Sequence, residues 1–304
     1  MKRNLVIVGL GGIGFRYDRG LTGGVPTQTH ASAALKHSYF NLVAGVDFDE
    51  SRRLEFKICL DLPAFESMLS LNESIREDID CFIVSVATAE HLNVLQEVLS
   101  VRPDAWIMCE KPLCESLEQV EQLSQILDLN KLLVNYSRRF SKDVVKCRDI
   151  FNQAIANSLE DRRKITCKIY GGMKRTGSHF IDLTNLWFLQ SYHHFNLAQL
   201  SKTKGGLIIK YPTVEVEFMD EDPGSSESFG ILEFHSEATS VVFIRDELHF
   251  TSPFESFSLK VDVNQLDSLE AFKSLIVSDG TRNLCSYGDA QLVQVILALT
   301  EDKI

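Results

Sequence analysis

Predominantly apolar runs alternate with amphipathic segments through the first 136 residues of the chain. The runs occupy residues 5–8, 41–47, 80–86, 105–109 and 132–136. Such runs are typical of parallel strands buried on both faces, and apolar positions recurring every three or four residues are typical of the helices that cover them. We therefore predict a doubly wound parallel sheet of the α/β class for residues 1–136.

The pattern changes in residues 137–304. We expect helices at residues 143–158, 179–189 and 289–300, and strands at 165–170, 214–218, 231–234, 241–244 and 257–261. Two-residue alternation in these strands indicates a large, mostly antiparallel sheet with one polar face. The prediction is a second, α+β domain that binds substrate and mediates oligomerisation, with the cleft between the two halves as the expected ligand site.

Glycines directly follow the first apolar run, at positions 9, 11 and 14. This spacing is typical of a turn that binds the pyrophosphate of a dinucleotide between a strand and a helix. Further glycines and Pro26 lie within the next dozen residues, so we interpret 15–26 as an inserted loop and expect the helix at 29–36.

Asp47 ends the second apolar run. A carboxylate there can accept hydrogen bonds from both ribose hydroxyls of an adenosine and would repel a 2′-phosphate, which favours NAD over NADP. Arg52 and Arg53 can weaken this preference, although we interpret them as part of a solvated helix face.

Charge and cysteine content narrow the class of protein. The 31 basic and 42 acidic residues give a net charge of −11, which argues against nucleic acid or an anionic membrane surface as a partner. The 7 cysteines include no C-x-x-C pair, a pattern that favours reduced thiols in a cytoplasmic protein over disulfides or a metal site.

Glu110-Lys111-Pro112 follows the fourth apolar run. With the glycine turn, Val46-Asp47-x-Asp49, Thr88 and His91, and Gly177-x-His179-x-x-Asp182, it forms an ordered set of motifs. This set resembles the Gfo/Idh/MocA family of NAD(P)-dependent oxidoreductases over about three-fifths of the chain. The resemblance implies an N-terminal Rossmann domain. It also implies hydride transfer between NAD (or NADP) and a secondary hydroxyl or ketone of a sugar, cyclitol or nucleotide sugar. Finally, it implies a homo-dimer or homo-tetramer that forms through the C-terminal sheet.

The resemblance also implies a set of site residues. Lys111 and His179 occupy the family's catalytic positions, and histidine suits the role of general base because its pKa lies near neutrality. The expected cofactor-binding residues are Gly9, Gly11, Gly12, Ile13, Gly14, Asp47, Ala87, Thr88, His91, Glu110 and Lys111. The expected substrate-binding residues are Lys111, Arg138, Arg175, His179 and Asp182, and no metal is expected.

Arg175 departs from the family pattern, which has an aspartate four residues before the histidine. Three explanations are open: His179 and Lys111 suffice, Arg175 binds an anionic substrate, or the protein binds dinucleotide without turnover as a sensor or regulatory protein. We favour the first two together. The Gly-Ser-His and Phe-Ile-Asp-Leu sequences around His179 resemble, more loosely, family members of surface-polysaccharide or nucleotide-sugar pathways.

Overall fold

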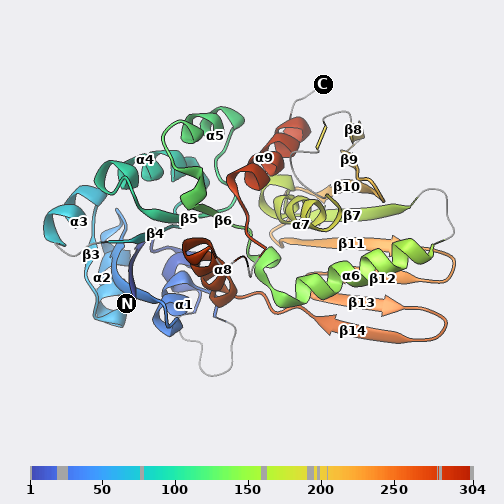
Figure 1. Ribbon diagram of the computed structural model, residues 1–304, viewed down its shortest axis with the longest axis horizontal. Coiled ribbons are helices and arrows are strands. Elements are labelled where there is room, and N and C mark those ends of the chain that lie inside the picture. Colours follow the sequence, from blue (N-terminus) through green and yellow to red (C-terminus); the bar gives the residue numbers. More distant parts are fainter. Residues whose placement is uncertain are drawn as a thin grey trace. The chain divides into compact units, whose positions relative to one another are not determined.

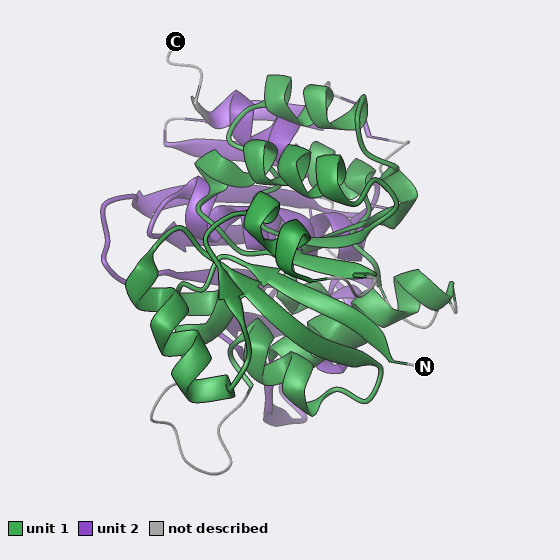
Figure 2. Cartoon of the chain, turned by 90° about the vertical axis from the view of Figure 1, so that its left-hand side faces the viewer, with its two compact units in different colours: residues 1–140, 264–291 green, residues 141–263, 292–304 purple. Residues whose placement is uncertain are grey.

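The chain forms two compact units. The computed structural model describes residues 2–18, 27–75, 79–158, 163–189, 195–196, 199–203, 205–278, 280 and 283–301. Unit 1 contains residues 1–140 and 264–291, and unit 2 contains residues 141–263 and 292–304 (Figure 2).

Unit 1 is built on a parallel six-stranded sheet in the order β3-β2-β1-β4-β5-β6 (Figure 1). Its strands are β1 (Arg3–Val8), β2 (Phe40–Val46), β3 (Ala64–Phe65), β4 (Cys81–Val84), β5 (Trp106–Glu110) and β6 (Leu132–Asn135). Every residue of β4 and β6 is buried, as expected for strands covered on both faces. The predicted doubly wound sheet is confirmed.

Helices cover both faces of this sheet (Figure 1). They are α1 (His30–Lys36), α2 (Glu50–Leu60), α3 (Met68–Ser74), α4 (His91–Val101), α5 (Leu117–Ser124) and α8 (Gln265–Val277). Hydroxyl and carboxylate side chains start several of them: Thr29 accepts from Ser32 N–H and Asp49 from Ser51 N–H. These caps satisfy donors that a helix start leaves unpaired.

α8 returns to unit 1 from the C-terminal part of the chain, so the predicted division into residues 1–136 and 137–304 differs from the observed units. The Phe272 ring stacks on Phe40 with 5.5 Å between ring centroids, and His37 Nε2 lies 3.1 Å from Glu270 Oε1. Farther along, Cys285 C=O accepts a 3.1 Å hydrogen bond from Val134 N–H. Burial of the apolar side of α8 joins this segment to unit 1.

Unit 2 contains an eight-stranded sheet in the order β14-β13-β12-β11-β7-β10-β9-β8. Its strands are β7 (Lys164–Tyr170), β8 (Leu200–Thr203), β9 (Gly206–Lys210), β10 (Glu215–Asp222), β11 (Phe229–His235), β12 (Ser240–Ile244), β13 (Glu247–Thr251) and β14 (Ser256–Lys260). Only β7 and β10 pair in parallel. The predicted mostly antiparallel sheet is therefore confirmed.

One face of this sheet forms the core of unit 2. Helices α6 (Lys142–Asn157) and α7 (Ser178–Phe188) supply rings to it, with Trp187 next to both Phe151 and Phe243. Gly230 has no side chain where the Phe180 ring packs, since a Cβ there would lie 2.3 Å from a ring carbon. The last helix, α9 (Tyr287–Glu301), contains the unit boundary at residue 291.

Candidate functional site

The glycine turn lies at the carboxyl end of β1, within unit 1. Gly9 has a φ of +97°, and a Cβ on it would lie 2.6 Å from the Ser85 backbone carbonyl. A Cβ on Gly14 would lie 2.0 Å from Gly9 O, so only glycine allows this close approach. At Gly11 the nearest atom is Arg52 Nη1, 3.8 Å from the position of a Cβ. The turn therefore has the open backbone that a dinucleotide pyrophosphate requires.

The segment after the turn begins with one π-helical turn, Gly12–Arg16. Phe15 N–H and Arg16 N–H both donate to Gly11 O at 3.0 Å, and the Tyr17 ring lies beside Gly12. α1 starts only at His30, close to the predicted helix at 29–36. Most of the predicted insertion, residues 19–26, lies outside the described residues.

Asp47 connects the end of β2 to the glycine turn. Its side chain is only 2% exposed: Oδ2 accepts a 2.8 Å hydrogen bond from Leu10 N–H and Oδ1 a 2.9 Å bond from Asp49 N–H. Arg52 Nη1 lies 3.3 Å from Asp47 Oδ2. Arg52 is thus paired with the carboxylate predicted to bind ribose, rather than simply solvated, and it brings positive charge to the glycine turn.

The carboxyl end of β4 presents Ala87 and Thr88, the start of a short 3-10 turn that leads into α4. His91 follows and is fully buried. Its Nδ1 lies 3.1 Å from both Pro112 O and Leu113 O, and its Nε2 lies 3.2 Å from Val86 O. Burial lowers the pKa of His91 despite these carbonyls. His91 thus holds the turn that follows Lys111 in place through its contacts with Pro112 O and Leu113 O.

Glu110 ends β5 and lies in a polar cluster that the sequence interpretation did not find. Its Oε1 accepts hydrogen bonds from His30 Nε2 at 2.8 Å and Asn135 Nδ2 at 2.6 Å, and its Oε2 accepts one from Lys111 N–H at 3.3 Å. Burial alone would raise the pKa of Glu110, but the bond and charge of His30, the Asn135 bond and the Lys111 charge outweigh it and lower the pKa.

A sequence signal for this cluster does exist. Asn135 ends the apolar strand β6 as Glu110 ends β5, and these two residues are paired in the strand register. Carboxyl ends of neighbouring parallel strands meet at one edge, so a polar residue ending each strand predicts contact between them. His30 and Gln265 have no comparable signal, because α1 and α8 reach this edge only through packing.

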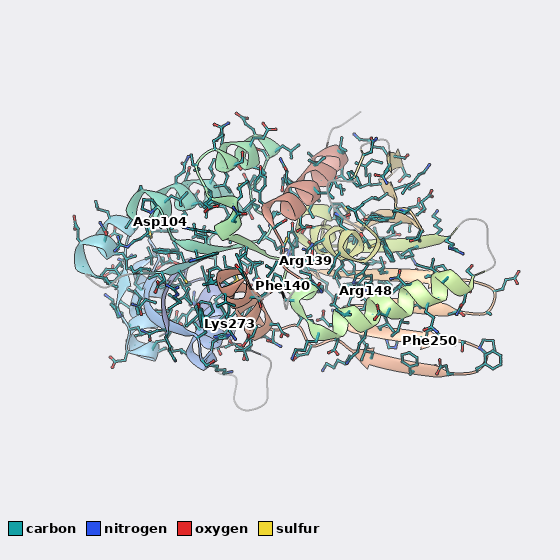
Figure 3. All side chains as sticks on the ribbon, in the orientation of Figure 1. Asp104, Arg139, Phe140, Arg148, Phe250 and Lys273 are labelled. Atoms are coloured by element: carbon teal, nitrogen blue, oxygen red, sulfur yellow. The ribbon has the colours of Figure 1, made fainter. Side chains whose placement is uncertain are left out.

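The two arginines after β6 differ in their surroundings. Arg139, which is labelled in Figure 3, is 2% exposed. Its Nη1 donates to Leu284 O at 2.7 Å and lies 3.5 Å from Asp289 Oδ2. Arg138, the predicted substrate residue, is half-buried in the 3-10 turn Ser137–Phe140. Arg139 thus joins segments of unit 1.

The remaining predicted residues lie in unit 2, around the start of α7. A π-helical turn, Met173–Gly177, leads directly into this helix, and Arg175 is exposed on it. Nine of the 11 residues of α7 are buried; His179 is half-buried, whereas Asp182 is only 1% exposed. His179 therefore lies on the least buried side of α7, and Asp182 on a buried side.

A second buried polar cluster lies farther along α7. Tyr211 Oη donates to Asn185 Oδ1 at 2.7 Å and lies 2.9 Å from Thr184 Oγ1, which itself lies 2.9 Å from Phe180 O. Burial raises the pKa of Tyr211, so the cluster is neutral at physiological pH.

Unit 1 contains a cavity of about 450 Å³. It is lined by Phe15, Asp18, Thr29, Ala31, Ser32, Leu35, Lys36, Cys59 and Leu60. None of the predicted site residues lines it. Among the described residues, no helix combines the length and apolar character needed to cross a bilayer.

Solved structures share this fold. A dehydrogenase (MviM) from Clostridium difficile superposes with a TM-score of 0.70 at 14% identity, covering 100% of both chains. KijD10, a 3-ketoreductase from Actinomadura kijaniata crystallised with NADP and TDP-benzene, has a TM-score of 0.72 at 13% identity, covering 99% of this chain and 97% of its own.

An oxidoreductase from Agrobacterium radiobacter, in complex with NAD⁺, L-tartaric acid and magnesium, has a TM-score of 0.69 at 9% identity and covers 98% of this chain and 95% of its own. At such identities the likeness concerns the fold. No curated protein matches the chain.

The family comparison covers the N-terminal part of the chain. Residues 3–137 match the model described as "Oxidoreductase family, NAD-binding Rossmann fold". This match confirms the predicted family and the nicotinamide cofactor class. Over residues 3–137, the chain is similar to the Gfo/Idh/MocA family of oxidoreductases.

Proposed function

We propose that the protein is an NAD(P)-dependent oxidoreductase that transfers a hydride between a nicotinamide cofactor and a secondary hydroxyl or ketone of a sugar or nucleotide sugar. The observation that carries the proposal is the placement of Lys111 and Glu110 at the carboxyl end of β5, in the same parallel sheet as the glycine turn after β1. In open α/β sheets, ligands bind at this edge.

The residues of unit 1 fit a dinucleotide. In the proposed role, the glycine turn holds the pyrophosphate, Asp47 faces the adenosine ribose, and Arg52 offsets the repulsion between Asp47 and a 2′-phosphate. Ala87 and Thr88 line the same edge. The bound nicotinamide supplies or accepts the hydride. Either NAD or NADP is compatible with the Asp47–Arg52 pair.

The proposed proton-transfer residues are Lys111 and His179. A lysine ammonium can hydrogen-bond the substrate oxygen and stabilise the negative charge that develops on it. A half-buried histidine can take or give the hydroxyl proton near neutral pH. Asp182 is buried beside His179 on the same helix, so its proposed contribution is to orient the histidine rather than to bind substrate.

Two arginines, Arg175 and Arg138, support the proposal that the substrate is negatively charged. The exposed Arg175 replaces the usual aspartate, and Arg138 is half-buried after β6. Guanidinium groups bind phosphate oxygens in pairs of hydrogen bonds. The presence of TDP-benzene in the KijD10 structure makes nucleotide sugars the first substrates to test.

The experiment combines binding and turnover. Calorimetry with NADH and NADPH tests the cofactor, and nucleotide sugars, free sugars and cyclitols are then screened for a change in reduced-nicotinamide absorbance. We expect cofactor binding and turnover of at least one compound. Lys146→Met serves as a control for Lys111→Met, because Lys146 lies on α6 with its side chain 64% exposed.

The exposed Arg175 favours one alternative, a dinucleotide-binding sensor or regulatory protein without turnover. Binding of NADH without turnover of any compound in the screen would support the sensor. Failure to bind either cofactor would contradict both proposals.

Two further properties belong to the proposal. Assembly into a homo-dimer or homo-tetramer through the second face of the unit 2 sheet is part of the proposal; this face carries the partly exposed ion pairs Lys164–Glu217 and Lys168–Glu233. All seven cysteines are free thiols, which supports a cytoplasmic location. A mass measurement in solution tests the first property.

A further inference from the structure

Three elements of unit 1 that are distant in sequence meet at Glu110. His30 belongs to α1, Asn135 to β6 and Gln265 to α8. Asn135 Nδ2 donates both to Glu110 Oε1 at 2.6 Å and to Gln265 Oε1 at 3.1 Å. His30 is 0% exposed, Asn135 2% and Gln265 6%, so this cluster is shielded from water.

The donors to Glu110 are arranged on one side of its carboxylate. An ionised carboxylate only accepts, so His30 Nε2 carries the proton of the 2.8 Å bond. Both side-chain donors converge on Oε1, and Oε2 is left to accept from Lys111 N–H. The bonds thus fix the orientation of the carboxylate relative to the residue that follows it.

The cluster is not explained as a device for stability alone. A buried ion pair often contributes no more stability than apolar residues of the same shape. In addition, His30 Nδ1 and Asn135 Oδ1 are buried and have no hydrogen-bond partner among the described residues. An apolar contact between α1, β6 and α8 would avoid both unpaired atoms.

Further hydrogen bonds tie the cluster to the two ends of the insertion after the glycine turn. Gln265 N–H donates to Thr27 O at 2.8 Å. Asp18 accepts from Gln28 N–H and Thr29 N–H at 2.9 and 2.8 Å. α1, whose first residue is His30, therefore has its start fixed both to the glycine-turn segment and to α8.

We propose that His30, together with Asn135 and Gln265, positions Glu110, and through it Lys111, for reaction. This inference rests on the proposed function, in which Lys111 contacts the substrate oxygen. His30, Asn135 and Gln265 are positioning residues. They hold Glu110 oriented and negatively charged, and the Glu110 charge favours the ammonium form of Lys111, which is the form that donates to a developing oxyanion.

Groups from several elements surround Glu110: His30 from α1, Lys111 from the end of β5, Asn135 from β6 and, behind Asn135, Gln265 from α8. His91, at the start of α4, also interacts with the Glu110 charge. Removing the His30 donor leaves the carboxylate with fewer bonds in a buried place. Its negative charge is then less favourable. A carboxylate that has lost this bond can also turn away from Lys111, which weakens the charge interaction that favours the ammonium form.

The test requires no substrate. Lys111 is acylated with acetic anhydride at mildly alkaline pH, and the rate at this lysine is read by peptide mass spectrometry, with Lys146 as the internal reference. Only the free amine reacts. Glu110→Gln is expected to increase the rate at Lys111 by about tenfold, the effect of removing a neighbouring opposite charge, and His30→Leu is expected to increase it by a smaller factor. His30→Gln keeps an N–H donor and is expected to restore most of the wild-type rate.

His37→Leu is the matched control. His37 and Glu270 form a second histidine–glutamate contact between the end of α1 and α8, with 3.1 Å between Nε2 and Oε1. If His30 served only to join these elements, His37→Leu would change the Lys111 rate as His30→Leu does. We expect a lower melting temperature for His37→Leu and an unchanged rate at Lys111.

Equal Lys111 rates in wild type, His30→Leu and Glu110→Gln would overturn the proposal. If His30→Leu does not fold, Gln265→Met removes the acceptor behind Asn135 and is read in the same way. Absence of turnover with every compound screened would reject the proposed function and leave the acylation result intact. Where a substrate is found, His30→Leu should lower kcat with little change in the KM for the cofactor, and His30→Gln should restore kcat.

Discussion

The two buried polar clusters, one in each unit, differ in charge. In unit 1, Glu110 is held ionised by His30 and Asn135 at the end of the parallel strands. In unit 2, Tyr211, Asn185 and Thr184 form a neutral cluster against α7. Neutral hydrogen bonds in a core contribute modestly to stability, whereas a buried charge has a large desolvation cost.

This difference separates a cluster that specifies structure from one that supports chemistry. The neutral cluster fixes how α7 packs through the bonds of Tyr211 to Asn185 and Thr184, although Asn185 Nδ2 is buried without a hydrogen-bond partner among the described residues. The charged cluster likewise leaves buried atoms of His30 and Asn135 without partners among the described residues, but it also holds a carboxylate, that of Glu110, next to Lys111. Groups retained despite such a cost are common at functional sites.

The largest expected effect is on turnover. Glu110→Gln keeps the shape of the side chain and removes its charge, so we expect kcat to fall about tenfold to a hundredfold through misplacement of Lys111. Tyr211→Phe should leave kcat unchanged. Steady-state kinetics on a compound found in the substrate screen measures both. An equal fall in kcat in Glu110→Gln and Tyr211→Phe would show that the charged and neutral clusters do not differ in their effect on catalysis.

On stability the order reverses. Tyr211→Phe removes the donor to Asn185 Oδ1 and leaves buried polar atoms unpaired, so we expect a loss of about 1–3 kcal/mol in the free energy of unfolding. Urea denaturation measures this loss, and Tyr170→Phe is the control because Tyr170 is only half-buried, on β7. Equal stability of the wild type and Tyr211→Phe would show that the neutral cluster contributes nothing.

The charged cluster predicts a pH effect of known sign. The pKa of Glu110 is lowered in the folded protein from its ordinary value of 4.5. Its contribution to stability is therefore fully present above pH 4.5 and is lost as the pH falls through the lower, folded pKa. Glu110→Gln should flatten the acid side of the stability curve below this pH. If the free energy of unfolding fell equally steeply with decreasing pH in the wild type and in Glu110→Gln, this result would argue against an ionised Glu110.

The smallest effect concerns the cofactor. Arg52 is 34% exposed and pairs with Asp47, so its charge is partly screened. Arg52→Ala should weaken NADPH binding about threefold relative to NADH, because the loss exposes a 2′-phosphate to the Asp47 charge. Calorimetry with both cofactors measures the ratio, and Arg148→Ala on α6 is the control. An unchanged ratio would mean that Arg52 does not affect selectivity.

Local sequence patterns predicted the elements that local physics determines. Apolar runs identified strands β1, β2, β4, β5 and β6, because burial on both faces requires continuous hydrophobicity. Gly9 and Gly14 were identifiable because any Cβ would collide with neighbouring backbone. In unit 2, two-residue alternation located β10, β11 and β12 to within a few residues.

Features that depend on long-range packing were not predicted. Leu266, Leu269 and Phe272 have helical spacing after the capping residue Asn264, a local signal for α8 that the sequence interpretation overlooked. No local signal places that helix in unit 1 beside α1. For the same reason the contacts of His30 and Gln265 with the Glu110 cluster were not foreseen, although Lys111 itself was recognisable from Glu110-Lys111-Pro112.

The central claim is that Lys111 acts in the chemical step of an NAD(P)-dependent oxidoreductase. The most direct measurement compares wild type with Lys111→Met in two assays: NADH and NADPH affinity by calorimetry, and oxidation of reduced cofactor in the presence of keto sugars and keto nucleotide sugars. We expect similar cofactor affinities in the two proteins and turnover about a hundredfold to ten-thousandfold lower in Lys111→Met. Equal turnover in the two proteins would contradict the central claim.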